Sequence, residues 1–113
     1  MASETDGAFN AQILDELYAV IESRKGADPS TSRTAQLFHR GVAKIAQKVG
    51  EEAVETLIEA VRGNKELLAE ESADLLYHLL VLWADQDVKP EAIWQALAKR
   101  RETSEMVEET KPA

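Results

Sequence analysis

Two long segments with apolar residues at helical spacing meet at Gly63 and Asn64, and this arrangement constrains the fold more than any other feature. The first segment begins near Thr34 and runs to about Val61, and the second spans roughly residues 65–85. Gly63 suits the left-handed position after a helix end, and Asn64 is a good N-cap. The pattern therefore predicts two long antiparallel helices joined by a tight turn.

Shorter helices are expected on either side of this pair. Apolar spacing predicts a first helix from Phe9 to about Arg24, followed by a loop rich in Gly, Pro, Ser and Thr. Pro90 suits the first position of a last helix. Because no alternating strand pattern occurs, we expect an all-α fold of four to five helices around a central antiparallel helical hairpin.

The length of 113 residues fits one domain, predicted over residues 9–102 between flexible segments at 1–8 and 103–113. With only two Trp, two Tyr and two Phe, the core must be built mainly from aliphatic side chains, which suits helix packing. A chain of this size buries a limited share of its surface. We therefore expect a homodimer to complete the helical bundle.

The formal net charge of −8 argues against binding to nucleic acid or to anionic membranes. It would also repel a polyphosphate, so binding one requires metal ions or a local basic cluster. The absence of cysteine excludes a thiolate nucleophile and a thiolate zinc site. No signal-like N-terminus and no membrane-length apolar run occurs, so a cytoplasmic location is expected.

Acidic residues interrupt the apolar faces of both hairpin helices. At 100° per residue, Glu52 and Glu55 project on the apolar side of the first helix, whereas Glu51 points about 100° away from Glu52. Glu71 falls inside the apolar stripe of the second helix, with Asp74 at its edge. A carboxylate that faces a core costs several kcal/mol unless it is paired, neutralised or bound to a cation.

The hairpin brings these acids to matching heights. With a rise of about 1.5 Å per residue, Glu55 and Glu71 lie roughly 11–12 Å from the turn, and Glu52 and Asp74 lie about 16 Å from it. Four carboxylates this close require positive charge between them. An all-carboxylate set suits a hard cation, Mg²⁺ or Mn²⁺.

Two other interpretations of the acids are open. They could be a solvated face supported by lysines at helical spacing. That reading does not explain why two helices break their apolar stripes at the same height. A ferritin-like di-iron site is the other carboxylate-rich possibility in a helical bundle, but it requires Glu-x-x-His pairs, and none occurs.

The string Glu51-Glu52-Ala53-Val54-Glu55, followed after fifteen residues by Glu71-Ser72-Ala73-Asp74, resembles the EExxE…ExxD motif of the MazG-type all-α nucleotide pyrophosphohydrolases. The wider strings KVGEEAVETLIEA and ADLLYHLLVLW resemble the phosphoribosyl-ATP pyrophosphohydrolase family of histidine biosynthesis, over roughly residues 13–101. The loop DPSTSRTAQL departs from that family's usual DPxxSYTxxL, with Arg33 in place of Tyr.

The resemblance implies Mg²⁺-dependent hydrolysis of the α–β phosphoanhydride of phosphoribosyl-ATP in a homodimer. It implies Glu52, Glu55, Glu71 and Asp74 as metal ligands, the set that the projection selects. Water is the expected nucleophile, and Glu51 is a candidate base. Glu55, as a ligand next to the reacting groups, is also a candidate catalytic residue.

Several residues are candidates for substrate binding, each with a structural alternative. Lys48 could contact a phosphate or pair with Glu52, and Arg24 and Lys25 could bind phosphates or favour the dipole of the first helix. Thr34 could donate to a phosphate, or it or Ser32 could cap a helix. His78 could support a ligating carboxylate or be a hydrogen-bonded core histidine.

Three functions are therefore compared. The leading hypothesis is phosphoribosyl-ATP pyrophosphohydrolase, and its nearest rival is a housekeeping MazG-type nucleoside triphosphate pyrophosphohydrolase with the same metal site. The third is a non-catalytic helical dimerisation module whose acids only solubilise it.

Overall fold

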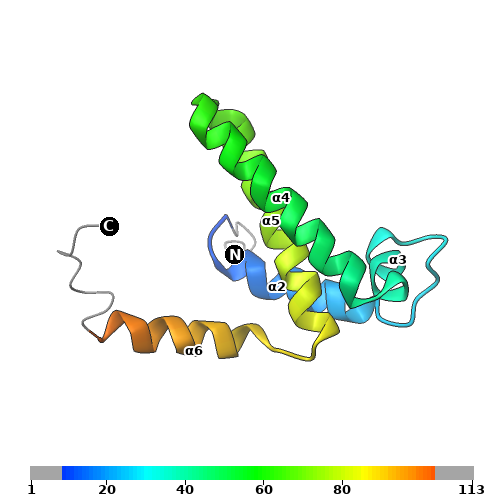
Figure 1. Ribbon diagram of the computed structural model, residues 1–113. Coiled ribbons are helices and arrows are strands. Elements are labelled where there is room, and N and C mark those ends of the chain that lie inside the picture. The colour runs from blue at the N-terminus through cyan, green and yellow to red at the C-terminus, as the bar shows by residue number, and fades with distance from the viewer. Residues whose placement is uncertain (1–8, 104–113) are drawn as a thin grey trace.

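The computed structural model describes residues 9–103, which form five helices and no strand (Figure 1). The helices are α2 (Gln12–Ser23), α3 (Arg33–Arg40), α4 (Val42–Arg62), α5 (Lys65–Asp85) and α6 (Pro90–Arg101). The all-α prediction with four to five helices is confirmed. The predicted flexible segments, 1–8 and 103–113, lie outside the described residues, except for Thr103.

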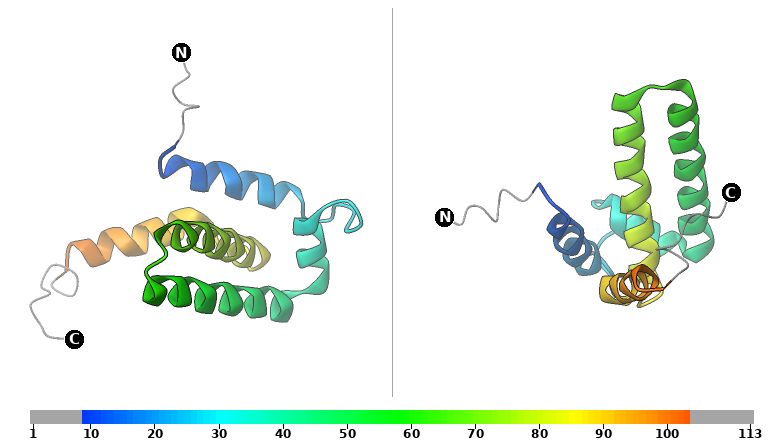
Figure 2. Two further views of the ribbon diagram at one scale, coloured as in Figure 1. Left: turned by 90° about the horizontal axis from the view of Figure 1, so that it is seen from above. Right: turned by 90° about the vertical axis from the view of Figure 1, so that its left-hand side faces the viewer.

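Helices α4 and α5 form the predicted antiparallel hairpin, seen side by side in Figure 2. Gly63 ends α4 with φ 78°, in the left-handed region that favours glycine. The side chain of Asn64 accepts a hydrogen bond from the backbone N–H of Leu67 at 3.0 Å and so caps α5. Both predicted signals at the turn are confirmed.

The prediction of one continuous helix from about Thr34 to Val61 is wrong. The chain breaks at Gly41, whose φ of 95° and ψ of 174° interrupt the helix, and α3 turns away from α4 (Figure 2). The apolar spacing runs on through the break because both helices face the same core, with Leu37 from α3 and Ile45 from α4.

The first helix is also shorter than expected. It begins at Gln12, and Phe9 lies outside it with 98% of its surface exposed. The side chain of Asn10 accepts a hydrogen bond from the Gln12 N–H at 2.8 Å, a local turn that competes with further helix. At the start of α3, Ser32 accepts from the Ala35 N–H at 3.0 Å, which identifies Ser32 as the cap.

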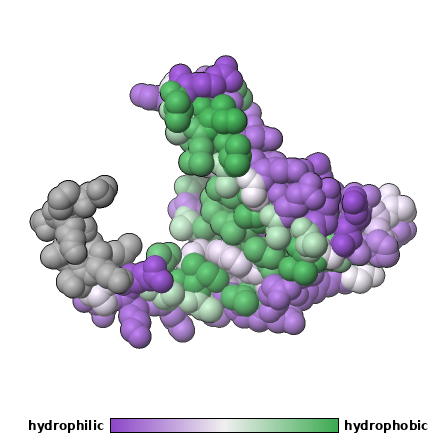
Figure 3. Space-filling view, viewed as in Figure 1, coloured by the Kyte–Doolittle hydropathy of each residue, from purple (hydrophilic) through white to green (hydrophobic). Residues whose placement is uncertain are grey.

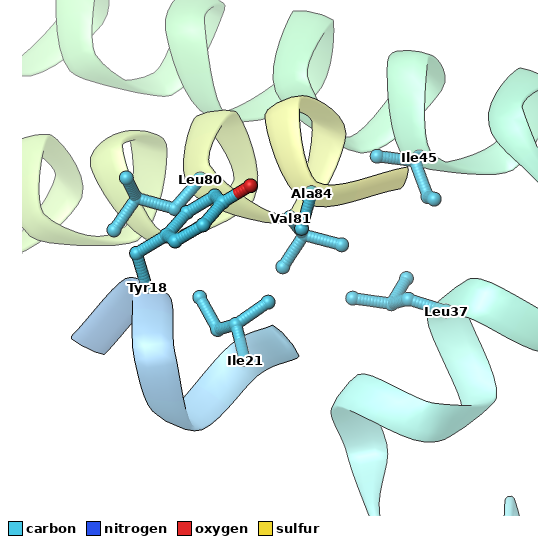
Figure 4. Packing of buried hydrophobic residues seen from close by; sticks show 7 residues of the cluster. All are labelled: Tyr18, Ile21, Leu37, Ile45, Leu80, Val81 and Ala84. Atoms are coloured by element: carbon cyan, nitrogen blue, oxygen red, sulfur yellow. The ribbon is translucent and has the colours of Figure 1, made fainter. Parts of the chain in front are cut away.

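The core lies at the base of the hairpin, where side chains from α2, α3, α4 and α5 meet (Figure 4). Its buried members are Tyr18, Ile21, Leu37, Ile45, Leu80, Val81 and Ala84. The hairpin tip projects beyond this core, and α6 leaves the body in another direction (Figure 1).

Trp94 joins α6 to α5 and α2. The Trp94 ring packs edge-on against Trp83, with ring centroids 6.3 Å apart, and its Nε1 donates to Asp15 at 3.3 Å. Within residues 9–103, no helix combines the length and the apolar character needed to cross a membrane.

The turn conformation gives the first prediction. Nothing lies within 4 Å of a Cβ built at Gly63, so a substitution there is opposed by the backbone conformation alone. We expect Gly63→Ala to lower the free energy of unfolding by about 1–2 kcal/mol in urea denaturation at fixed protein concentration. Gly63→Asn should recover part of the loss, since Asn tolerates this region better. Equal stability of the Ala variant and the parent would contradict this account of the turn.

Candidate metal centre between the hairpin helices

Three carboxylates meet between α4 and α5. One oxygen each from Glu52, Glu55 and Glu71 lies within 4.8 Å of the other two. Glu52 and Glu55 are three residues apart on α4 and therefore project on neighbouring positions of one helix face. Glu71 comes from α5 at the height that the hairpin geometry predicts. We call these three residues the acidic cluster.

The acidic cluster has oxygens without a protein partner. Glu52 Oε1 and Glu71 Oε1 are buried and accept no hydrogen bond within the described residues. Burial, followed by the neighbouring carboxylates of Glu55 and Glu52, raises the pKa of Glu71 to about 7. Glu55 is exposed and opens the cluster to solvent. Converging oxygens that repel one another and lack donors fit a divalent cation.

Asp74 is the predicted ligand that does not join the acidic cluster. It is exposed, one helical turn from Glu71, and its carboxylate lies outside the converging set. The projection placed Asp74 at the edge of the apolar stripe, and this edge position agrees with its exposure. The structure thus brings together three of the four predicted ligands.

Glu51, the candidate base, lies outside the acidic cluster on the exposed side of α4. Gln47 Nε2 donates to its carboxylate at 2.8 Å, and Lys48 Nζ lies 3.4 Å from it. Gln47 first and then Lys48 lower the pKa of Glu51. Glu51 is therefore ionised at neutral pH, and Lys48 pairs with Glu51 rather than with Glu52.

A hollow of about 570 Å³ opens beside Glu51 and Glu55 on α4. Its other lining residues are Gln47, Gly50, Val54 and Ile58. All of these residues lie on one face of α4, where carboxylates and aliphatic side chains are neighbours, and Glu55 belongs both to this face and to the acidic cluster.

The two cations after α2 have different surroundings. Lys25 Nζ lies 3.0 Å from Asp87 Oδ1 and 5.9 Å from the centroid of the Phe38 ring, so it joins α2 to the α5–α6 connection. Arg24 is exposed and donates to Ser23 Oγ at 3.1 Å. The Lys25 contacts give it a structural role, and phosphate binding by either residue stays a prediction.

His78 is a core histidine in this structure. It is 7% exposed, and its Nδ1 lies 2.8 Å from the backbone oxygen of Asp74 on its own helix. The contact is with the backbone of Asp74 and not with its carboxylate. Of the two readings of His78, the structure favours the hydrogen-bonded core histidine over an outer-shell partner or substrate contact.

Two residues near the acidic cluster were missed by sequence reasoning. Glu59, one turn beyond Glu55, has a buried Oε1 that finds no hydrogen-bond partner in the described part of the chain, while its Oε2 lies 3.5 Å from Arg62 Nη1. Its spacing of seven residues from Glu52 was the available signal. Tyr77, one turn after Asp74, forms a hydrogen bond with Thr34, the candidate substrate residue. No local pattern indicates a contact between residues 43 positions apart.

The raised pKa of Glu71 predicts how the stability of the metal-free protein depends on pH. Between pH 4.5 and about 7 the folded chain holds a proton on Glu71 that the unfolded chain releases. The free energy of unfolding should therefore fall as pH rises through this window and should level off above it. We expect Glu71→Gln to remove this decrease, as measured by urea denaturation with EDTA present. Glu70→Gln, which changes an exposed acid, should keep it. An identical pH profile for Glu71→Gln and the parent would contradict the assignment.

Known proteins resemble this chain closely. Residues 14–101 match the family model described as phosphoribosyl-ATP pyrophosphohydrolase. A phosphoribosyl-ATP pyrophosphatase of Azospirillum brasilense is 66% identical over 100 residues, covering 88% of this chain and 90% of the relative. One from Paramagnetospirillum magneticum is 60% identical over 97 residues, covering 86% and 89%. With the helical hairpin and its acidic cluster in place, this match shows that the chain belongs to the phosphoribosyl-ATP pyrophosphohydrolase family.

Proposed function

We propose that this chain is an enzyme of histidine biosynthesis that hydrolyses the α–β phosphoanhydride of phosphoribosyl-ATP. Water is consumed, and the products are phosphoribosyl-AMP and pyrophosphate. Family membership supports the choice of substrate. The observation that supports the chemistry is the acidic cluster, in which Glu52, Glu55 and Glu71 converge and two buried oxygens have no donor among residues 9–103.

The acidic cluster fits a hard divalent cation, and we propose Mg²⁺, with Mn²⁺ as a substitute. Glu52, Glu55 and Glu71 would hold it, and we retain Asp74 as a fourth ligand because it lies one turn from Glu71 on α5. When bound, such a cation neutralises the carboxylates, contacts substrate phosphates and lowers the pKa of a bound water.

The residues around the acidic cluster have separate tasks in this proposal. Glu51 is ionised and can accept a hydrogen bond from the attacking water, while Gln47 and Lys48 hold its carboxylate in place. Lys48 also brings one positive charge to a site dominated by acids. Glu55, exposed at the mouth of the hollow, is the ligand that substrate phosphates approach first.

We also propose that the enzyme is a homodimer that pairs through α4. Four aliphatic side chains on the outer face of this helix are largely exposed: Val54 at 55%, Leu57 at 63%, Ile58 at 47% and Val61 at 88%. Figure 3 shows apolar surface continuing along the projecting part of the hairpin. Such a patch is unfavourable in water and favours association with a matching surface. A second copy on this face would also cover the hollow beside Glu55.

The proposed activity can be tested directly. Purified protein with Mg²⁺ should convert phosphoribosyl-ATP to phosphoribosyl-AMP and pyrophosphate, and EDTA should abolish turnover. A panel of ordinary and damaged nucleoside triphosphates, assayed side by side, should be hydrolysed far more slowly. Rapid hydrolysis of another triphosphate beside negligible activity on phosphoribosyl-ATP would instead identify a housekeeping pyrophosphohydrolase.

Two matched substitutions test whether the acidic cluster takes part in catalysis or only contributes negative charge. Glu55→Gln should lower turnover by about a hundredfold or more while helicity is retained, because it removes a metal ligand. Glu70→Gln removes the same charge from an exposed position outside the acidic cluster and should keep full activity. Full activity of Glu55→Gln would exclude the proposed site, and no Mg²⁺-dependent turnover at all would favour the dimerisation module.

The dimer gives a separate prediction. Leu57→Asp places a charge in the centre of the exposed apolar face and should convert a dimer to a monomer in sedimentation velocity, with helical content retained. Val20→Asp changes an apolar residue on α2 that is 47% exposed and lies away from this face, so it should remain dimeric. A Leu57→Asp protein with the parent's sedimentation coefficient would rule out pairing through α4.

A further inference from the structure

A hydroxyl pair joins α5 to the start of α3. Thr34 Oγ1 and Tyr77 OH lie 2.5 Å apart, and both side chains are partly buried. The other long-range hydrogen bonds between side chains of residues 9–103 involve a carboxylate: Lys25 to Asp87, Lys89 to Glu22 and Trp94 to Asp15. The Thr34–Tyr77 pair is thus the one that connects two uncharged groups.

Tyr77 lies on α5, the helix that also supplies Glu71 of the acidic cluster. It follows Asp74 by one turn and Glu71 by about 9 Å of helix rise. Its ring packs edge-on against His78, with centroids 4.8 Å apart and an interplanar angle of 79°. His78 is itself fixed to the Asp74 backbone oxygen. The position of the Tyr77 hydroxyl is therefore set by the helix that supplies Glu71.

Helix α3 has other contacts besides the hydroxyl pair. Ser32 caps this helix, and Ala35 and Leu37 are buried in the protein interior at 3% and 8% exposure. A phenylalanine at position 77 would keep the packing of the ring. What the Tyr77 hydroxyl adds is a fixed orientation for the hydroxyl of Thr34, a residue that is partly exposed.

Either hydroxyl can donate this hydrogen bond, and binding of a phosphate requires one of the two directions. Phosphate oxygens accept hydrogen bonds, so a hydroxyl that binds one must donate its own proton. If the Tyr77 O–H donates to Thr34 Oγ1, the proton of Thr34 is free for such a contact, and the two bonds strengthen each other.

We propose that Tyr77 is a positioning residue: its hydroxyl donates to Thr34 Oγ1 and so orients the Thr34 hydroxyl as a donor to a phosphate oxygen of the substrate. This inference rests on the proposed function, because the phosphate is that of phosphoribosyl-ATP. In this proposal the acidic cluster binds the divalent cation, and the hydroxyl pair adds a neutral hydrogen-bond donor on the side of the hairpin that faces α3.

The test separates KM from kcat. We expect Tyr77→Phe and Thr34→Val each to raise the KM for phosphoribosyl-ATP by about five- to tenfold, with kcat and the Mg²⁺ requirement unchanged. The double variant should be no worse than either single variant, because both remove the same donor. Thr34→Ser, which keeps a hydroxyl, should restore most of the parental KM.

Tyr18→Phe is the matched control. The Tyr18 hydroxyl donates to the backbone oxygen of Val88 at 2.9 Å and joins α2 to the α5–α6 connection, so its loss should lower the melting temperature without changing KM. A Tyr77→Phe protein that behaves like Tyr18→Phe, less stable but with the parental KM, would overturn the inference. In that case parental turnover of phosphoribosyl-ATP would leave the proposed function standing. If the parent protein did not hydrolyse phosphoribosyl-ATP, the result would exclude both the proposed function and the inference about Tyr77.

Discussion

Crowding of carboxylates inside an otherwise apolar helical hairpin is the constraint on which the rest of this structure depends. Packing of α4 against α5 brings Glu52, Glu55 and Glu71 together, where lost hydration and mutual repulsion oppose folding. The effect is visible at Glu71, whose pKa rises to about 7. A core at the hairpin base and a capped turn at its tip hold these acids in place, so a cation is the natural means to offset their repulsion.

Helix α4 presents three different surfaces. Ile45 and Glu52 face α5 and contribute to the core and the acidic cluster. Val54 and Leu57 lie on the outer face, which nothing in the described chain covers. Glu55 lies at the border between them, beside the hollow. The proposed metal site and the proposed dimer interface would thus share one helix, because a partner on the outer face would lie beside Glu55.

Three lysines of this acidic chain form ion pairs with carboxylates. Lys25 and Lys89 form ion pairs with Asp87 and Glu22, and both pairs connect α2 to the segment between α5 and α6. Exposed pairs of this kind contribute little stability individually. Lys48 differs, since its partner Glu51 adjoins the acidic cluster. In a chain with a net charge of −8, the proposed binding of substrate phosphates would therefore rely on a bound cation and neutral donors more than on lysine.

Local signals in the sequence determined the hairpin, its turn at Gly63 and the common height of Glu55 and Glu71, because helix period, caps and rise depend only on neighbouring residues. The break at Gly41 escaped prediction since α3 and α4 share one core and the apolar spacing continues across it. Only the tertiary structure decided which partners the charged and polar groups find. The contact between Thr34 and Tyr77 and the placement of Asp74 outside the acidic cluster depend on how separate helices pack, which no local pattern encodes.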